Sequence, residues 1–266
     1  MKPPIITLLT DFGSQDYFVG AMKGAILSIN PDARIVDITH EIPPQNIRAA
    51  AFNLLACYKS FPEGTIHVAV VDPGVGSSRR PILIESGEQF FVGPDNGIFS
   101  WVCEREGNCR CIDLTNDNFF HHPVSATFHG RDIFAPVAAA LSNGVSPGEL
   151  GVPLDDPVKL DSIKPRTMNK DAVEGSIIHI DCFGNCITNL TRPDFSDSAR
   201  VIINDREITS FREFFAEGND EAGELFCILG SAGFLEIVAR NASAARVLNA
   251  SVGERVKLIL RAEKSK

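Results

Sequence analysis

Apolar and polar residues alternate along the first half of the chain with two different periods. Short uninterrupted apolar runs indicate buried strands, and apolar positions three or four residues apart indicate helices. Strands are expected at residues 5–9, 34–38, 66–71, 82–85 and 89–92, and helices at residues 18–29, 46–59, 98–105 and 133–141. We expect Asp16 to cap the first helix and Asn30-Pro31 to end it. This alternation predicts an α/β N-terminal domain with a mostly parallel sheet and helices on both of its faces.

The pattern changes in the second half of the chain. Residues 147–171 are rich in proline, glycine and aspartate, which is typical of a linker. Beyond them, short strands are expected at residues 176–180, 200–203, 225–229, 235–239 and 255–260, with helices at residues 211–215 and 242–248. The sequence therefore predicts an α/β domain over residues 1–152, a linker over 153–171 and a smaller, mainly antiparallel β domain over 172–266.

The charge balance argues against two classes of partner. The 266 residues include 34 acids and 25 bases, giving a net charge of −9, and no basic cluster is longer than Arg79-Arg80. We therefore expect neither a nucleic acid nor an anionic membrane surface as a partner. The N-terminal apolar run is cut off by Asp11, unlike a signal peptide, and no apolar stretch is long enough to span a bilayer.

The cysteines indicate a reducing compartment rather than a metal site. Their number, seven, is odd, which favours free thiols in a cytoplasm over a disulfide framework. None of them forms a Cys-x-x-Cys pair, and the chain has no P-loop, dinucleotide fingerprint or His-Glu-x-x-His motif. The sequence therefore predicts no metal ion and no other cofactor.

The most informative motif follows the strand expected at residues 66–71. It reads Val71-Asp72-Pro73-Gly74-Val75-Gly76, and Arg79 comes three residues later. Strand ends of α/β proteins are common ligand sites, and proline and glycine form a turn of little bulk that a ligand can approach. This turn can bring Arg79 back to Asp72 and hold its carboxylate in one orientation. The alternative is a tight turn with a purely structural ion pair.

Two further turns of the first domain carry candidate residues. Asp11 and Asp16 lie in the first β–α turn, where two carboxylates suit sugar hydroxyls or an amine better than a pyrophosphate. The alternative there is a helix cap and a turn carboxylate. Phe128-His129-Gly130 precedes the helix expected at residues 133–141. A lone histidine is more often structural, but a loop position between an aromatic residue and a glycine favours a site.

Three turns of the second domain combine polar and small residues. The turn from Asp181 to Asn185 offers a carboxylate for an amine, the Phe183 ring for stacking and an amide for a base edge, or it is only a β-turn. The segments 230–233 and 239–242 flank a strand. Their backbone N–H groups can receive a carboxylate or a purine edge, or they are ordinary hairpin turns.

Taken together, these segments resemble one family, the S-adenosylmethionine hydrolases, also called S-adenosylmethionine hydroxide adenosyltransferases, which are relatives of fluorinating and chlorinating enzymes. The resemblance covers nearly the whole chain and rests on six segments in order: Thr10–Gly13, Val71–Gly76, Gly93–Gly97, Phe128–Asp132, Asp181–Asn185 and Ala239–Ala242. It implies an N-terminal α/β domain and a C-terminal β domain. It also implies a homotrimer that binds S-adenosylmethionine between the N-terminal domain of one subunit and the C-terminal domain of its neighbour.

The resemblance also implies roles for individual residues. Asp72, Arg79 and His129 would activate a water molecule. Asp11 would hold the ribose hydroxyls, and Phe128 is expected to contact the substrate beside His129. The methionine end would be held by Asp16, Asp181 and Ser231. The residues expected around the adenine are Phe183, Asn185, Arg240, Asn241 and Ala242.

The halogenating relatives differ from this chain at positions near the reacting atoms. They carry an aromatic residue near the sugar at the position of Gln45 and an arginine near the methionine carboxylate at the position of Ala232. They also have a neutral aromatic residue at the position of Asp72 and a serine at that of Gly130. Because a carboxylate repels a halide strongly in a partly buried site, water is favoured over chloride or fluoride.

The predicted reaction is hydrolysis of S-adenosylmethionine to adenosine and methionine by attack of water at C5′ of the ribose. The sulfonium leaves as a neutral thioether, so the reaction needs orientation and a base but no general acid. One alternative is a non-catalytic protein that binds adenosine or S-adenosylmethionine. Two others are a halide-using adenosyl transferase and a metal-dependent hydrolase built on Asp11, Asp72 and His129.

Overall fold

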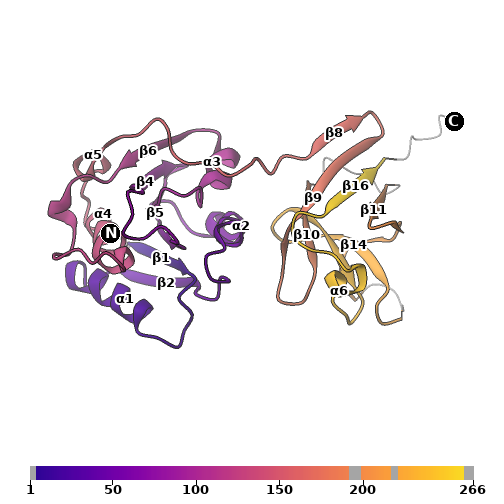
Figure 1. The fold of residues 1–266 in the computed structure, drawn as a ribbon, viewed down its shortest axis with the longest axis horizontal. Coiled ribbons are helices and arrows are strands. Elements are labelled where there is room, and N and C mark those ends of the chain that lie inside the picture. The colour runs from indigo at the N-terminus through magenta and orange to yellow at the C-terminus, as the bar shows by residue number, and fades with distance from the viewer. Residues whose placement is uncertain (1–3, 192–198, 217–220, 261–266) are drawn as a thin grey trace. The chain divides into compact units, whose positions relative to one another are not determined.

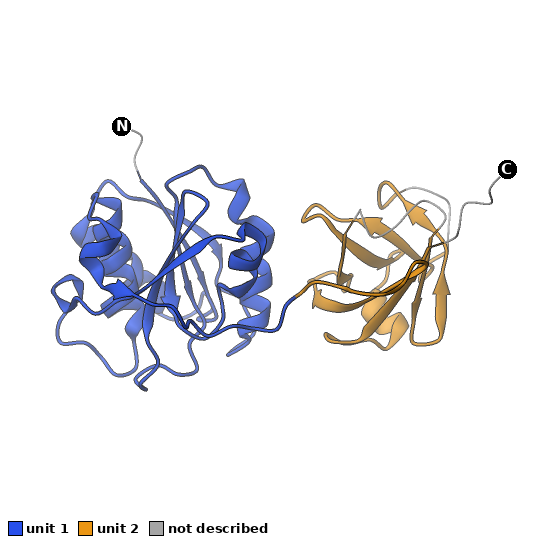
Figure 2. Cartoon of the chain, turned by 90° about the horizontal axis from the view of Figure 1, so that it is seen from above, with its two compact units in different colours: residues 1–162 blue, residues 163–266 orange. Residues whose placement is uncertain are grey.

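The chain folds as two units, residues 1–162 and 163–266, in the computed structural model, which describes residues 4–191, 199–216 and 221–260 (Figures 1 and 2). The division lies inside residues 153–171, the segment expected as a linker. Its first part packs on unit 1, where the indole Nε1 of Trp101 donates to the carbonyl of Asp161 at 3.0 Å. Its second part forms β8 (Arg166–Asn169), which pairs with a strand of unit 2. The segment therefore contributes structure to both units.

Unit 1 is a sheet with helices on both faces (Figure 2). Its strands are β1 (Ile5–Thr10), β2 (Arg34–Thr39), β3 (Ile66–Val70), β4 (Pro81–Ser86), β5 (Gln89–Pro94), β6 (Cys109–Asp113) and β7 (Val152–Pro153). Its helices are α1 (Phe18–Ile29), α2 (Ile47–Cys57), α3 (Ser100–Glu106), α4 (Ala135–Ser142) and α5 (Pro147–Leu150). Short 3₁₀ turns follow α2 and β6, at Tyr58–Ser60 and Asp117–Phe119, and a π-helical turn, Gly130–Phe134, runs into α4. These elements match the α/β pattern expected for this part of the chain.

The sheet of unit 1 is mixed, so the expected mostly parallel sheet is only partly correct. The strand order in the described residues is β2-β1-β3-β5-β4-β6-β7. The pairs among β2, β1, β3 and β5 are parallel, and the pairs from β5 through β4 and β6 to β7 are antiparallel. The reversal is local: β4 and β5 form a hairpin whose turn residues Gly87 and Glu88 both have positive φ, as the favoured two-residue hairpin turns require.

The first two helices of unit 1 start differently. Helix α1 begins at Phe18 rather than after Asp16, and its N-cap residue, Tyr17, makes no side-chain capping hydrogen bond, so the predicted cap by Asp16 is wrong. The helix expected at residues 46–59 forms as α2 and the 3₁₀ turn after it, and Asn46 caps α2 by accepting the backbone N–H of Ala49 at 3.0 Å. None of the helices in the described part of the chain is long and apolar enough to cross a membrane.

One hydrophobic core of unit 1 combines residues of the sheet with residues of α1 and α4. Met22 and Ile26 of α1 are fully buried there against Val137 of α4 and Val68 of β3. This packing fixes the sheet against the helices. It also fixes the end of β1 beside the end of β3, where Thr10 pairs with Val70. The residues that follow, Asp11 and Asp72, therefore emerge at the same edge of the sheet.

Unit 2 is mainly antiparallel, as the sequence predicted. Besides β8, its elements are β9 (Ala172–Ile180), β10 (Cys186–Thr191), β11 (Arg200–Ile203), β12 (Arg206–Ile208), β13 (Phe211–Arg212), β14 (Leu225–Leu229), β15 (Phe234–Ala239), α6 (Ala244–Leu248) and β16 (Arg255–Ile259). The order in the described residues is β12-β11-β16-β9-β10-β15-β14-β13, with β8 beside β9, and only β13–β14 is a parallel pair among them.

The helices predicted in unit 2 are partly wrong. No helix forms at residues 211–215, because Phe211 and Arg212 pair with Cys227 and Ile228 of β14 as a short strand. The other helix, α6, begins at Ala244 because Ser243 takes the N-cap position and accepts the backbone N–H of Arg246. The predicted segment thus includes two residues of the preceding turn.

Candidate active site

A carboxylate, a guanidinium and an imidazole meet at the end of β3. Arg79 donates to Asp72 through Nε, at 3.0 Å to Oδ1 and 3.1 Å to Oδ2, and through Nη2 to Oδ2. Arg79 Nη2 also donates to His129 Nδ1 at 2.7 Å. The side chains of Asp72 and Arg79 are only 5% and 10% exposed. The structure therefore brings together the three residues that the sequence analysis placed in one catalytic group.

The local fold explains why this ion pair forms. The chain turns at residues 73–76, where the backbone N–H of Val75 donates to the carbonyl of Asp72 at 3.2 Å. Gly76 has a φ of +77°, and a Cβ there would overlap the carbonyl of Ala126. Only glycine fits this position without strain, so the turn returns Arg79 to Asp72 in one conformation. The guanidinium also stacks on the Phe134 ring, with 5.2 Å from Cζ to the ring centroid.

The hydrogen bond from Arg79 determines the protonation state of His129. A guanidinium has only donors, so Nδ1 of His129 must accept, and the imidazole proton must lie on Nε2. Burial and the charge of Arg79 lower the pKa of His129 below its ordinary value of 6.5, against the opposing effects of Asp72 and Asp132. His129 is therefore neutral near pH 7 and offers an N–H donor on its second nitrogen.

One donor of this group has no partner within the described residues. Nη1 of Arg79 is enclosed and makes no hydrogen bond there. An enclosed, unpaired donor costs free energy, and in native proteins it commonly marks a functional site or the place of a bound water molecule.

The turn after β1 is fixed by residues that the sequence analysis did not select. The hydroxyl of Thr10 lies 2.9 Å from His40 Nδ1, and His40 Nε2 lies 3.1 Å from Asp37 Oδ1. Thr10 Oγ1 in turn accepts the N–H of Phe12 at 3.2 Å, and the carbonyl of His40 accepts the N–H of Gly13 at 2.8 Å. The turn that carries Asp11 is thus held by hydrogen bonds to Thr10 and His40, and the His40 ring also lies beside the carboxylate of Asp37.

The carboxylate of Asp11 is held separately. Its Oδ2 accepts the backbone N–H of Gln45 at 2.8 Å, and Gln45 has a positive φ of 64°. A non-glycine residue in this conformation is strained, which often accompanies a functional arrangement. Asp11 keeps its other oxygen for a ligand, since Oδ1 accepts no hydrogen bond from the described residues.

The other two candidates of unit 1 differ in exposure. Asp16 is exposed in the same turn. Phe128 is only 6% exposed and packs in an aromatic cluster, with ring centroids 5.9 Å from Phe12 and 5.2 Å from Phe18. Its ring therefore supports the segment that carries His129, and little of its surface is available to a ligand.

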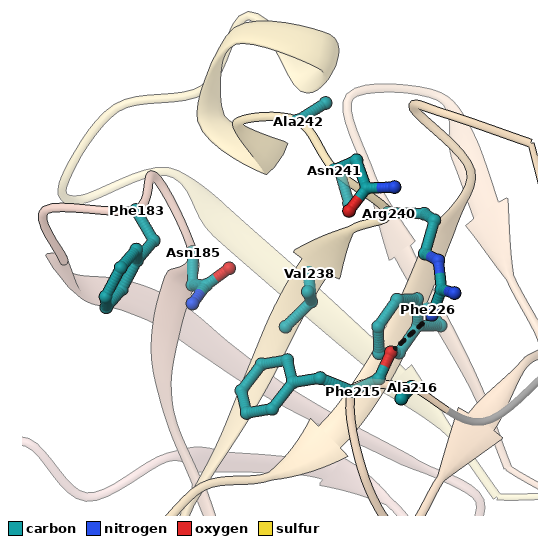
Figure 3. Close-up of a pocket in the computed structure, with 10 residues that line it drawn as sticks. Phe183, Asn185, Phe215, Ala216, Phe226, Val238, Arg240, Asn241 and Ala242 are labelled. Atoms are coloured by element: carbon teal, nitrogen blue, oxygen red, sulfur yellow. Dashed lines mark hydrogen bonds between the residues drawn. The ribbon is translucent and has the colours of Figure 1, made fainter.

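Unit 2 contains a pocket of about 720 Å³ (Figure 3). Figure 3 shows Phe183 and Asn185 on one side of it and Phe215, Phe226 and Arg240 on the other. The pocket is lined by Phe183, Asn185, Phe215, Ala216, Phe226, Val238, Ala239, Arg240, Asn241 and Ala242. All five residues that the resemblance placed around an adenine are on this list, so the structure brings them together.

The polar groups of this pocket are oriented by the backbone. Asp181 accepts the N–H groups of Phe183 and Asn185 at its Oδ1, and the Asn185 amide nitrogen donates to its Oδ2 at 2.9 Å. The amide oxygen of Asn185 is left to accept from a ligand. Arg240 donates through Nη1 to the carbonyl of Phe215 at 2.9 Å and so holds the segment that carries the Phe215 ring.

Two residues expected at the methionine end lie in turns of unit 2. Asp181 uses both carboxylate oxygens within its own turn, as just described. Ser231 is exposed in the turn between β14 and β15, where the N–H of Gly233 donates to the carbonyl of Gly230 at 3.0 Å. Neither residue lines the pocket itself.

The sequence analysis missed Phe215, Phe226 and Val238. Phe226 and Val238 are directly opposite each other on β14 and β15, at 1% and 3% exposed. Their alternation with the core residues Cys227 and Ile237 was visible in the sequence, but the use of the second face of the sheet as a pocket floor was not. Phe215 belongs to the segment wrongly predicted as a helix.

No group of three or more histidine, cysteine, aspartate or glutamate side chains is arranged to hold a metal ion in the described part of the chain. In particular, Asp11, Asp72 and His129 do not form such a group. The cysteines of the described segments are all free thiols.

Comparison with known proteins places both units in one family. Residues 6–151 match the SAM hydroxide adenosyltransferase N-terminal domain, and residues 175–257 match the SAM hydroxide adenosyltransferase C-terminal domain. The chain belongs to the SAM hydroxide adenosyltransferase family. The two matched segments contain the Asp72–Arg79–His129 group and the pocket of unit 2, respectively.

Individual members of the family align over nearly the full length. The (R)-S-adenosyl-L-methionine hydrolase of Methanocaldococcus jannaschii is 39% identical over 96% of this chain and 95% of the relative. The enzyme of the same name from Thermus thermophilus is 35% identical, over 97% and 100%. A fluorinase of an Actinoplanes species is more distant, at 28% identity over 72% of this chain and 73% of the relative. The crystal structure of an uncharacterized conserved protein from Thermotoga maritima, 37% identical, superposes with a TM-score of 0.88 over 96% of this chain and 99% of that chain.

Proposed function

We propose that this SAM hydroxide adenosyltransferase hydrolyses S-adenosyl-L-methionine to adenosine and L-methionine. The observation that carries the proposal is the group formed by Asp72, Arg79 and His129 at the sheet edge that also carries Asp11. The relatives named (R)-S-adenosyl-L-methionine hydrolase support the same substrate and reaction.

In the proposed reaction, a water molecule lies beside Asp72 and His129 and attacks C5′ of the ribose. The new C5′–O bond forms as the C5′–S bond breaks, and sulfur keeps the electron pair, so methionine leaves as a neutral thioether. The attacking water becomes a protonated alcohol, a strong acid, and gives up a proton during the attack. A carboxylate is therefore a sufficient base, and a hydroxide ion need not form beforehand.

The protonation states divide the roles. Oδ1 of Asp72 accepts one hydrogen bond, from Arg79 Nε, and retains a lone pair for the proton of the water molecule. His129 carries its proton on Nε2 and so donates to the water oxygen, which orients the lone pair opposite the departing sulfur. Arg79 bonds both Asp72 and His129 and so holds the base and the donor in position around the water molecule.

The substrate contacts follow the positions of the candidates. Asp11 binds the ribose hydroxyls through its free oxygen, and the adenine occupies the pocket of unit 2, where the amide oxygen of Asn185 accepts from its exocyclic amine. Asp16, Asp181 and Ser231 hold the methionine end. Because the chemical group lies in unit 1 and the pocket in unit 2, we propose that two subunits of a homotrimer form each site. The cysteine usage supports a reducing, cytoplasmic location.

Water rather than a halide is the proposed nucleophile. The Asp72 side chain is 5% exposed, and its carboxylate is adjacent to the place of the nucleophile. An anion placed there would be repelled with little solvent screening. The relatedness to fluorinases therefore does not extend to halide use.

The test is incubation of the purified chain with S-adenosylmethionine, with separation of the products by chromatography. Equal amounts of adenosine and methionine are expected. Asp72→Asn and His129→Asn should each lower turnover by ~10²-fold or more, which is the typical contribution of a positioned base. Glu85→Gln, which breaks an exposed ion pair with Arg110, is the control and should leave turnover unchanged. Binding of S-adenosylmethionine without release of adenosine would identify a non-catalytic binding protein and overturn the proposal.

A further inference from the structure

Glu236 is an acidic residue on the sheet face that forms the pocket of unit 2. Along β15, side chains of this face alternate with core residues, so Glu236, Val238 and Arg240 follow one another on it. Val238 and Arg240 line the pocket, and Glu236 lies two residues, about 7 Å, before Val238. The cross-strand neighbours of Glu236 are Ile228 and Ile187, which are both apolar and buried.

The carboxyl group of Glu236 is buried without a protein partner. The residue is 9% exposed, and no hydrogen bond reaches the carboxyl group from the described residues. Its oxygens are not among the fully enclosed polar atoms that lack a partner, so the tip of the side chain keeps some access to solvent. Burying an unpaired carboxyl group is unfavourable, and no hydrogen bond from the described part of unit 2 compensates for it.

Two turns of unit 2 come close to this carboxyl group, the one with Ser231 and the one with Asp181. Gly230, next to Ser231, lies against it so closely that a Cβ there would overlap Oε1. The charged group that faces it within the described residues is Asp181. Burial, and then the charge of Asp181, raise the pKa of Glu236 to about 7.

We propose that Glu236 binds the α-ammonium group of the amino-acid tail of S-adenosylmethionine and so selects ligands that carry this tail. The proposal rests on the proposed function, because it takes the purine to lie in the pocket. A ligand with its purine over Val238 extends along the strand either toward Arg240 or toward Glu236. The ammonium group of the zwitterionic tail is attracted by the carboxyl group, which favours the direction toward Glu236. An ammonium group also supplies the N–H donors that this carboxyl group lacks, whereas a sulfonium has none.

The proposal explains why Asp181 and Glu236 are close together although two acids repel each other. Asp181 spends its oxygens on the turn that holds Phe183 and Asn185. Asp181 therefore contributes negative charge and keeps one acceptor position, on Oδ2. Glu236 accepts no hydrogen bond from the described residues, so both of its oxygens are available to the ammonium group. Because its pKa is about 7, its carboxylate forms as the pH rises through neutrality, and the affinity for an aminated ligand should rise with it.

The experiment measures dissociation constants of the full chain for two stable ligands by calorimetry. S-Adenosylhomocysteine carries the amino-acid tail, and 5′-methylthioadenosine has the same nucleoside and sulfur without it. Glu236→Gln, which preserves shape, should weaken S-adenosylhomocysteine about tenfold or more and leave methylthioadenosine unchanged. The ratio of the two constants should also favour S-adenosylhomocysteine increasingly from about pH 6 to about pH 8 in the natural chain but not in the variant. Glu207→Gln, an exposed acid paired with Arg200, is the matched control.

The outcomes separate this proposal from the proposed function. If both ligands weaken equally in Glu236→Gln, or neither does, Glu236 has a structural role and the inference is wrong. A pH dependence that persists in the variant contradicts it as well. Failure of the natural chain to bind either nucleoside refutes the proposed function instead. Glu236→Asp, which keeps the charge but shortens its reach, should retain the pH dependence and lose part of the affinity.

Discussion

The ion pair between Asp72 and Arg79 gives the sharpest prediction, because its strength follows from its burial. We consider Asp72→Asn, Arg79→Met and the double variant. Each single change leaves one buried charge without its partner, and breaking a buried pair in this way costs about 3–5 kcal/mol of unfolding free energy. In the double variant neither charge remains, so its loss should be smaller than the sum of the single losses. We expect a coupling energy of about 3 kcal/mol.

A solvent-exposed ion pair of the same unit gives the coupling energy against which the buried pair is compared. Glu85 and Arg110 form a bond of 3.0 Å on the sheet surface, with side chains 27% and 57% exposed. Solvent screens such a pair, and its coupling should be about 0.5 kcal/mol. Both pairs join a carboxylate to a guanidinium, so the difference between their coupling energies in double-mutant cycles measures the effect of burial.

The assay is urea unfolding followed by tryptophan fluorescence. The chain has one tryptophan, Trp101, buried in α3, so its emission reports the unfolding of unit 1 without a contribution from unit 2. A coupling energy for Asp72–Arg79 no larger than that of Glu85–Arg110 would refute the reasoning. It would mean that the turn does not hold the carboxylate in a shielded position. The three variants should also lose similar factors in turnover, because groups that act as a unit are not additive.

Three further predictions concern other parts of the account. Burial and the charge of Arg79 lower the pKa of His129 below 6.5, so turnover should be constant near pH 7 and fall on acidification with a midpoint below 6.5. The fall is expected because protonation removes the lone pair with which His129 accepts from Arg79. A midpoint above 6.5 in a pH–rate profile contradicts this prediction. Gly184→Ala should weaken adenosine binding and destabilise unit 2 by about 1–3 kcal/mol, because Gly184 has a φ of +84° and a Cβ there would overlap Ser243. Gly253→Ala is its control, with a φ of +93° and no neighbouring atom, and equal effects of the two on binding would exclude the steric explanation. Prolonged treatment with a chelator should leave turnover unchanged, and a loss restored by a divalent cation would favour the metal-dependent alternative.

The catalytic group could be predicted from the sequence where its geometry is local. Asp72 and Arg79 are seven residues apart across a turn whose proline and glycines are visible in the sequence. The pairing of these two side chains follows from the conformation of this turn, which proline and glycine determine. His129 joined them only through the resemblance, since its contact with Arg79 spans fifty residues and depends on how the π-helical turn packs against the sheet edge.

Polar contacts between residues far apart in the chain could not be predicted from the sequence. The contacts of His40 with Thr10 and Asp37 involve two neighbouring parallel strands, whose register shifts between Leu8 and Leu9. No periodicity marks such a contact. The hairpin of β4 and β5 is a different case, because two strands separated by so few residues, without room for a crossover helix, already imply an antiparallel pair.

Some residues of the pocket in unit 2 could be recognised from the sequence and others could not. Its turn residues Phe183, Asn185 and Arg240 were recognisable because turns concentrate polar and small side chains. Its floor was not recognisable, because Phe226 and Val238 are apolar strand residues of the kind that every sheet buries. They become part of a pocket only through the pairing of β14 with β15 and through the turns that carry the other lining residues.

The central claim is that water attacks C5′ of S-adenosylmethionine beside Asp72, Arg79 and His129. The most direct measurement is the reaction in water enriched in oxygen-18, with mass analysis of both products. The account predicts one heavy oxygen in the 5′-hydroxyl of adenosine and none in methionine. Adenosine without the label, or a halogenated nucleoside formed in the presence of chloride, would contradict it.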